Sequence, residues 1–138
     1  MHSAASPVPT PGLAPAAPPS TRREQARLGD RAVLAAVGLA TLGALALGWQ
    51  YNAPGLAFGL ALPLLAAAVL AVWLAPGLLL SRMVLCVALA GLVMLHIQLS
   101  LGTIEYHFGV FVTLALMLVY RDWRPILLAA ALFAVHHV

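Results

Sequence analysis

The sequence predicts an all-α membrane protein, a polytopic bundle of about five transmembrane helices of which the last is truncated. Of its 138 residues, 63% are hydrophobic and only 8% are charged, and the mean hydropathy is +1.00. Soluble proteins carry about 25% charged residues. The apolar residues also form long uncharged runs separated by Pro, Gly and polar turns. A single domain of this length could not bury so much apolar surface in a soluble core.

The first 31 residues differ from the rest. Residues 1–20 are rich in Pro, Ala and Ser, which predicts a disordered tail, and His2 within it has no expected role. Residues 21–31 hold four of the arginines and are typical of a basic flank at the cytoplasmic surface of a membrane. The transmembrane module is expected to follow, over residues 32–138.

The first two expected spans cover residues 32–49 and 56–74. The first is uncharged and ends at Trp49, a residue type that anchors helices at the membrane interface. A turn at residues 52–55 follows. The second span contains Pro63, which neighbouring helices can accommodate. A competing interpretation makes residues 32–46 the core of a signal peptide, but a proline-rich leader of about 30 residues is atypical of such signals.

The remaining expected spans cover residues 80–101, 104–120 and 125–138. A very short connection at Gly102 and Thr103 joins the first two of these. In the loop before the last span, Asp122 suits a helix N-cap and Pro125 suits the first helical turn. The last apolar segment is shorter than the roughly 20 residues that a spanning helix needs. The chain is therefore expected to be a piece of a longer protein, with a natural short protein as the alternative.

The basic residues predict the orientation. All seven are arginines, and they precede the first span, lie at the boundary between the second connection and the third span, or fall in the fourth connection, so the first and third connections carry none. Because basic residues accumulate on the cytoplasmic side, the N-terminus is expected in the cytoplasm of a bacterium, with the chain in its inner membrane.

Five ionisable residues inside the apolar segments form the candidate site: His96, Glu105, His107, His136 and His137. Such residues are costly in lipid, so they indicate function. Helical rise places them at a common level near the outer surface, on three helices. Side chains two positions apart point about 160° from each other, so the expected ligand set is His96, one of Glu105 and His107, and one of His136 and His137. These ligand types suit iron, copper or haem b. Alternatively, each histidine makes only a hydrogen bond between helices.

Several functions are disfavoured. The arginines do not alternate with aromatic residues, so a nucleic-acid partner is not expected. The lone Cys86 forms no metal-binding pair and suits apolar packing. Asp122 and the histidines lie toward opposite membrane faces, so no catalytic triad is expected and the chain is not predicted to be an enzyme.

The run from His96 through Glu105, His107 and Phe108, then Tyr120-Arg121-Asp122-Trp123-Arg124, and finally His136-His137, resembles a known family. It looks like the multi-pass membrane sensor module of bacterial methyl-accepting chemotaxis proteins, over about residues 83–138. Related modules precede diguanylate cyclase domains. The resemblance implies a sensory transducer that forms homo-oligomers through a C-terminal signalling region, which this sequence does not contain. Independently of the resemblance, the distribution of arginines predicts that Arg121, Asp122, Trp123 and Arg124 form a cytoplasmic loop.

Three functions therefore remain open from the sequence. The favoured one is the sensory input module of a chemotaxis transducer, with the lipid bilayer as its surroundings and the histidine cluster as its ligand site. The second is the input module of a membrane-anchored diguanylate cyclase. The third is a metal or proton transporter, in which the cluster would form part of a pathway.

Overall fold

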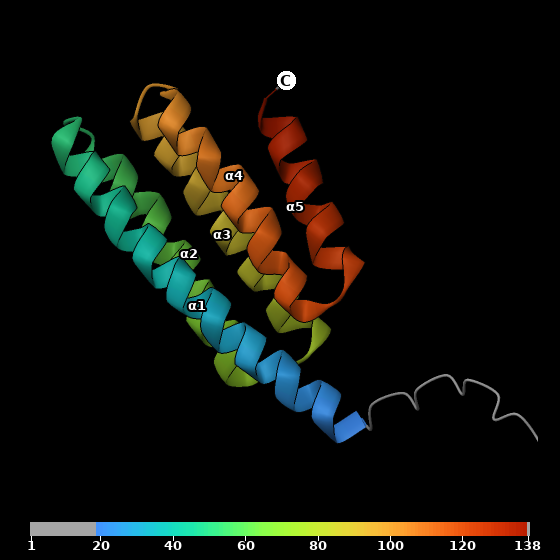
Figure 1. Cartoon of the computed structure of the whole chain (residues 1–138). Coiled ribbons are helices and arrows are strands. Elements are labelled where there is room, and N and C mark those ends of the chain that lie inside the picture. Colours follow the sequence, from blue (N-terminus) through green and yellow to red (C-terminus); the bar gives the residue numbers. More distant parts are fainter. Residues whose placement is uncertain (1–18, 138) are drawn as a thin grey trace, which may run out of the picture.

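The computed structural model describes residues 19–137, and all regular structure within that range is helical. Residues 1–18 of the expected tail, His2 included, and Val138 lie outside the described residues. Five α-helices and one short 3₁₀ helix follow one another: α1 (Pro19–Gln50), α2 (Pro54–Leu74), α3 (Leu79–Leu99), α4 (Ile104–Met117), η1 (Leu118–Tyr120) and α5 (Trp123–His136) (Figure 1). The predicted all-helical bundle is confirmed.

Helix α3 is the centre of the bundle. It contacts all four other α-helices, whereas α1 and α4 both pack on α3 and make little contact with each other. The helices run up and down, so that α1, α3 and α5 begin at one end of the bundle and α2 and α4 begin at the other (Figure 1). The end where α1, α3 and α5 begin is called the inner end below, and the opposite end is called the outer end.

Small residues allow the first three helices to approach closely. Ala44, Ala57, Ala61 and Ala88 are buried where α1, α2 and α3 meet, and a side chain at Gly48 would collide with Ala57. This kind of interface is common between helices in membranes, where close backbone contact replaces the hydrophobic effect as the source of attraction. Larger side chains fill the space between α3, α4 and α5, among them Leu85, Leu92, Met117 and Phe133.

Three helices, α1, α2 and α3, are long and apolar enough to cross a membrane, and the segments Ile104–Tyr120 and Trp123–His136 are apolar but shorter. The outside of the bundle is apolar as well, with Phe58, Leu70, Trp73, Phe108 and Phe111 exposed. Soluble monomers rarely expose large continuous apolar surfaces. Length, composition and surface together therefore indicate a membrane protein.

The structure changes some of the expected boundaries. Residues 21–31 are not a separate flank, because α1 is continuous from Pro19 and this segment consists mostly of strong helix formers such as Arg, Glu, Gln and Ala. Helix α3 ends at Leu99, two residues early, where Leu101 and Gly102 adopt positive φ angles of 57° and 79°. There the Gly102 N–H donates to the Ile97 carbonyl at 2.8 Å, a bond typical of helix C-terminal turns.

The start of α5 follows the sequence prediction. Asp122 is its N-cap, and the carboxylate Oδ1 accepts a hydrogen bond of 3.1 Å from the Arg124 N–H. Pro125 lies in the first turn, where a missing N–H costs nothing. Before it, Arg121 ends η1 with a φ of 52°, in the left-handed region that side chains other than glycine rarely adopt.

Candidate functional site

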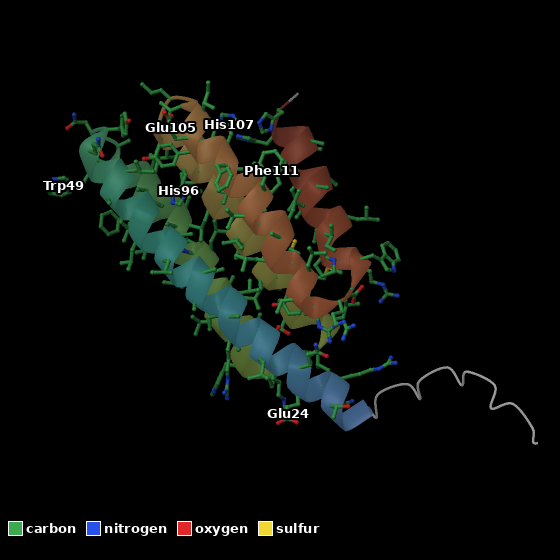
Figure 2. All side chains as sticks on the ribbon, viewed as in Figure 1. Glu24, Trp49, His96, Glu105, His107 and Phe111 are labelled. Carbon is green, nitrogen blue, oxygen red and sulfur yellow. The ribbon has the colours of Figure 1, made fainter. Side chains whose placement is uncertain are left out.

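The five predicted site residues lie toward the outer end, but they do not form one cluster. Figure 2 shows Glu105 and His107 near the end of the bundle opposite Glu24, with His96 deeper, between α1 and α4. His136 and His137 stand at the end of α5, which closes on the same side (Figure 1). The structure divides the five into a histidine group between α4 and α5 and a separate position for His96.

The histidine group consists of His107, His136 and His137. The ring centroids of His107 and His137 are 5.4 Å apart, and those of His136 and His137 are 5.5 Å apart, both in edge-to-face contact. Each Nδ1 of His107 and His137 bonds to a carbonyl of its own helix, at Thr103 (3.1 Å) and Phe133 (2.8 Å). These rings touch each other directly, which leaves no room for a porphyrin between them.

His96 faces the other way, toward α1. Its Nε2–H donates to the Ala40 carbonyl at 2.8 Å, and its ring centroid is 6.2 Å from that of Tyr106 on α4. A Cβ at Gly43 would lie 3.2 Å from Nε2, so a glycine at this position leaves space for the half-buried ring. The histidine thus joins α1 and α3 through a single hydrogen bond beneath α4.

The expected ligand set of His96 with residues of α4 and α5 is therefore not formed. The physical reason is that His96 lies on the α1 side of α3, whereas His107 and His137 lie between α4 and α5. Within residues 19–137, no group of three or more His, Cys, Asp and Glu side chains is arranged to hold a metal ion. The donors present do not fit the predicted iron, copper or haem site.

A groove takes the place of that site. A cavity of about 340 Å³ lies over α3 between α1 and α4, and its walls are mostly apolar. Four polar residues line it: His96, Glu105, Tyr106 and Thr113. Backbone carbonyls accept the hydrogen bonds of the Thr113 hydroxyl (2.8 Å, to Gly109) and of His96 Nε2 (2.8 Å, to Ala40), so His96 Nδ1, Glu105 and Tyr106 supply the polar groups available to a ligand. Glu105 lines this groove while His107 turns to α5, as expected for positions two apart.

A second polar centre, at the inner end, is built around Asp30. This residue is fully buried, and its Oδ2 accepts hydrogen bonds of 2.7 Å from the Gly77 N–H and from the Ser81 hydroxyl. Gly77 has a φ of 74°, and a Cβ there would lie 3.1 Å from the Arg23 carbonyl oxygen. Only glycine therefore lets the turn between α2 and α3 reach α1, where Asp30 holds it.

Arg82 and Tyr120 extend this centre to the last helices. An Arg82 Nη donates to the Gly77 carbonyl at 3.1 Å, another lies 3.5 Å from the Asp122 carboxylate, and the guanidinium stands 5.7 Å from the Tyr120 ring centroid. The Tyr120 ring lies against Gly29, where a Cβ would come within 3.0 Å of it. We call Asp30, Gly77, Ser81, Arg82, Tyr120 and Asp122 the inner network.

The inner network is incompletely bonded. Among the described residues, the buried side-chain nitrogen and oxygen atoms without a hydrogen-bond partner are Asp30 Oδ1, Arg82 Nε and the Tyr120 hydroxyl. The Tyr120 hydroxyl and the Asp30 carboxylate lie close to each other, so a small shift would pair this donor with this acceptor. Buried polar groups are normally paired, so three such atoms in one place mark a site where a ligand, water or another arrangement of the helices would complete the bonding.

Sequence reasoning missed the inner network because it assigned Asp30 to a solvated basic flank. The spacing of Asp30, Val33, Val37 and Ala44 contains the missing signal. These residues recur every three to seven positions, which places them on one helical face, and all four are fully buried. An acidic residue that continues an apolar stripe is expected to have buried partners.

Comparisons of the chain with protein families, with curated proteins and with solved structures give no match.

Proposed function

We propose that this chain is the membrane-embedded sensory input module of a bacterial chemotaxis transducer, with the groove between α1 and α4 as its ligand site. The observation that carries the proposal is that α3 contributes to both polar centres. His96 lines the groove, and Ser81 and Arg82 belong to the inner network. These positions are 15 residues apart on one continuous helix, a rise of about 22 Å.

A helix with this arrangement can transmit a signal. A ligand that prefers one position of α3 relative to α1 and α4 shifts the protein toward that position. Small helix displacements of about 1–2 Å are a common form of such switching. At the inner end, the same displacement changes the contacts of Ser81 and Arg82 with Asp30 and Asp122, which belong to α1 and the cap of α5.

The distribution of charge supports placement in the inner membrane with a cytoplasmic N-terminus. The seven arginines lie in the first part of α1, in the first part of α3, and at the junction of η1 and α5, where Arg121 and Arg124 stand on either side of the start of α5. These three helices begin at the same end of the bundle (Figure 1). The inner end would then face the cytoplasm, and the groove would lie toward the outer leaflet.

The motif that resembles chemotaxis transducers also coincides with the inner network. Within Tyr120-Arg121-Asp122-Trp123-Arg124, Tyr120 packs on α1, and Asp122 both caps α5 and pairs with Arg82. A signalling region in the cytoplasm would lie on the same side of the membrane as this network. The same input mechanism would serve a membrane-anchored diguanylate cyclase. The chemotaxis transducer and the cyclase differ only in their output domain. Homo-oligomers through that signalling region remain part of the proposal.

The groove favours a small molecule with an apolar body and a single polar head. Its apolar walls include Leu89, Val93 and Phe108, and its polar groups are close to one end. Pockets of this composition take their affinity from apolar contact and their specificity from a few polar groups. A photoreactive C8 alcohol carrying a diazirine is a suitable probe.

The experiment labels the full chain in neutral detergent with this probe and maps the adducts by mass spectrometry. Labelling of groove residues should saturate, and excess octanol should compete for it. His96→Ala should reduce it, while His136→Ala, an exposed histidine outside the groove, serves as the matched control. Labelling that never saturates, or that His96→Ala leaves unchanged, would contradict a ligand site in the groove.

The transporter alternative is tested separately, because residues 19–137 form no continuous polar route between the two centres. The residues between them include Val33, Val37, Leu85 and Leu89, and the buried Thr41 hydroxyl bonds to its own helix. Proteoliposomes with trapped zinc and pH indicators should therefore show no flux above that of empty liposomes. A zinc or proton flux that His96→Ala abolishes would overturn the sensory role in favour of transport.

A further inference from the structure

A pocket at the inner end shares Arg82, Tyr120 and Asp122 with the inner network, and the sensory mechanism described so far assigns it no ligand. Its volume is about 540 Å³, and polar residues of three segments line it: Arg22 and Gln25 from α1, Arg82 from α3, and Tyr120, Arg121 and Asp122 from the junction of η1 and α5. Three of these side chains are arginines and one is an aspartate. The pocket is therefore electropositive.

The single acidic side chain does not neutralise the pocket. One oxygen of Asp122 caps α5 and the other is 3.5 Å from Arg82, which is long for an ion pair between groups that are each 19% exposed. Arg22 and Arg121 are exposed and make no ion pair within residues 19–137. The charges of Arg22 and Arg121, and the part of the Arg82 charge that Asp122 does not neutralise, therefore remain available to an anion.

Unpaired donors lie at the same pocket. Tyr120 is 7% exposed, and its buried hydroxyl has no hydrogen-bond partner; the buried Nε of Arg82 also has none. Arg121, at the mouth, adopts the left-handed backbone conformation that is strained for arginine, and such conformations concentrate where a side chain has to be placed for function. Unsatisfied donors and a strained arginine in one electropositive cavity have a common explanation in a bound anion.

We propose that this pocket binds a phosphate group. Arginine guanidinium groups donate paired hydrogen bonds that match phosphate oxygens, and three arginines from separate elements can surround one such group. Basic pockets between helices on the cytoplasmic side of a membrane commonly hold anionic lipid headgroups. The phosphate can come from an anionic phospholipid headgroup or from free phosphate, and the two sources share the same contacts. The site is independent of the ligand role of the groove.

Binding of this group would connect α1, α3 and the start of α5, which the inner network joins only through Asp30 and Arg82. The phosphate contacts would complete the bonding of Arg82 Nε. A bound phosphate group is thus expected to stabilise the packing of α1, α3 and the start of α5 at the inner end.

The test compares two double variants with the same net charge. Arg22→Gln/Arg121→Gln removes two pocket arginines, and Arg23→Gln/Arg124→Gln removes two arginines that do not line the pocket. All four side chains are exposed, so folding is not expected to depend on them. The full chain is purified in neutral detergent. Retained phosphatidylglycerol is then counted by native mass spectrometry against phosphatidylcholine, and inorganic phosphate is titrated by calorimetry.

The full chain should retain phosphatidylglycerol in preference to phosphatidylcholine, or bind inorganic phosphate, and the pocket variant should lose about tenfold or more in affinity while the control variant stays within about twofold. If the pocket variant loses binding of phosphatidylglycerol alone, the ligand is a lipid headgroup. If it loses binding of inorganic phosphate alone, the ligand is the free anion. If the two double variants lose affinity equally, net charge alone explains the binding, and the proposed site is wrong. Absence of binding to the unmodified chain from either source would overturn it as well.

Discussion

Substitution of Gly77 by alanine tests whether Asp30 holds the turn between α2 and α3 against α1. Gly77 has a φ of 74°, and a Cβ there would lie 3.1 Å from both the Arg23 carbonyl oxygen and the Arg27 Cγ. The left-handed conformation alone costs a residue other than glycine about 1–2 kcal/mol. The added contact also pushes the turn away from α1, which lengthens the 2.7 Å hydrogen bond from the Gly77 N–H to Asp30.

The chain provides a matched control for this change. Gly102 has a φ of 79°, and a Cβ there would meet nothing within 4 Å, so Gly102→Ala carries only the conformational cost of about 1–2 kcal/mol. A hydrogen bond to a charged acceptor contributes about 1.5–3 kcal/mol. We therefore expect Gly77→Ala to lower the free energy of unfolding by about 2.5–5 kcal/mol, clearly more than the control.

Cys86 supplies the assay. It is the single cysteine of the sequence and is buried, so a thiol-reactive dye labels it only when the bundle opens. Labelling is followed as sodium dodecyl sulfate replaces a neutral detergent, for the unmodified chain and for both variants. Equal destabilisation by Gly77→Ala and Gly102→Ala would refute the close approach of the turn to α1 and the role of Asp30 in holding it.

Three further predictions follow from single contacts. Gly43→Ala should destabilise the chain relative to Gly38→Ala in the same unfolding assay, because a Cβ at Gly43 would lie 3.2 Å from His96 Nε2 and one at Gly38 meets nothing; equal effects would contradict the placement of His96. Asp122→Ala should cost about 1 kcal/mol through loss of the α5 cap, whereas Asp122→Asn, which can still cap, should cost less; an equal loss would assign the effect to the ion pair with Arg82 instead. In a Cys86→Ser background, a cysteine at Thr103 should react with a membrane-impermeant maleimide in intact cells and one at Arg27 should not; the reverse pattern would invert the proposed topology.

The sequence predicted the helices well because their signals are local. Turns at residues 52–55 and around Gly102, and the cap at Asp122, are set by residue types that favour such turns and caps, and the structure has helix ends close to each. Helix α1 begins at Pro19, before the expected membrane span of residues 32–49, because the charged segment ahead of that span is helical as well. Arginine and glutamate are good helix formers, so charged residues can continue a helix beyond the apolar segment that lies in the membrane.

The candidate site was less predictable because depth along a helix does not fix direction around it. Rise per residue correctly brought the five residues toward the outer end, but His96 turned to the Ala40 carbonyl on α1 and His107 to His137 on α5. Which neighbour a helical face meets depends on how α1 and α4 pack around α3, and no local pattern contains that information. The inner network shows the same limit, since its residues come from positions as far apart as Asp30 and Asp122.

The central claim is that α3 connects the groove at His96 with the inner network. Hydrogen–deuterium exchange of residues 75–82, which contain the Gly77 N–H bonded to Asp30, tests it most directly. His96→Ala should increase exchange in this segment several-fold relative to the unmodified chain, while His137→Ala, which removes an exposed ring at the same outer end, should leave it unchanged. Faster exchange that stays within one or two turns of His96, with no change at residues 75–82, would contradict the connection.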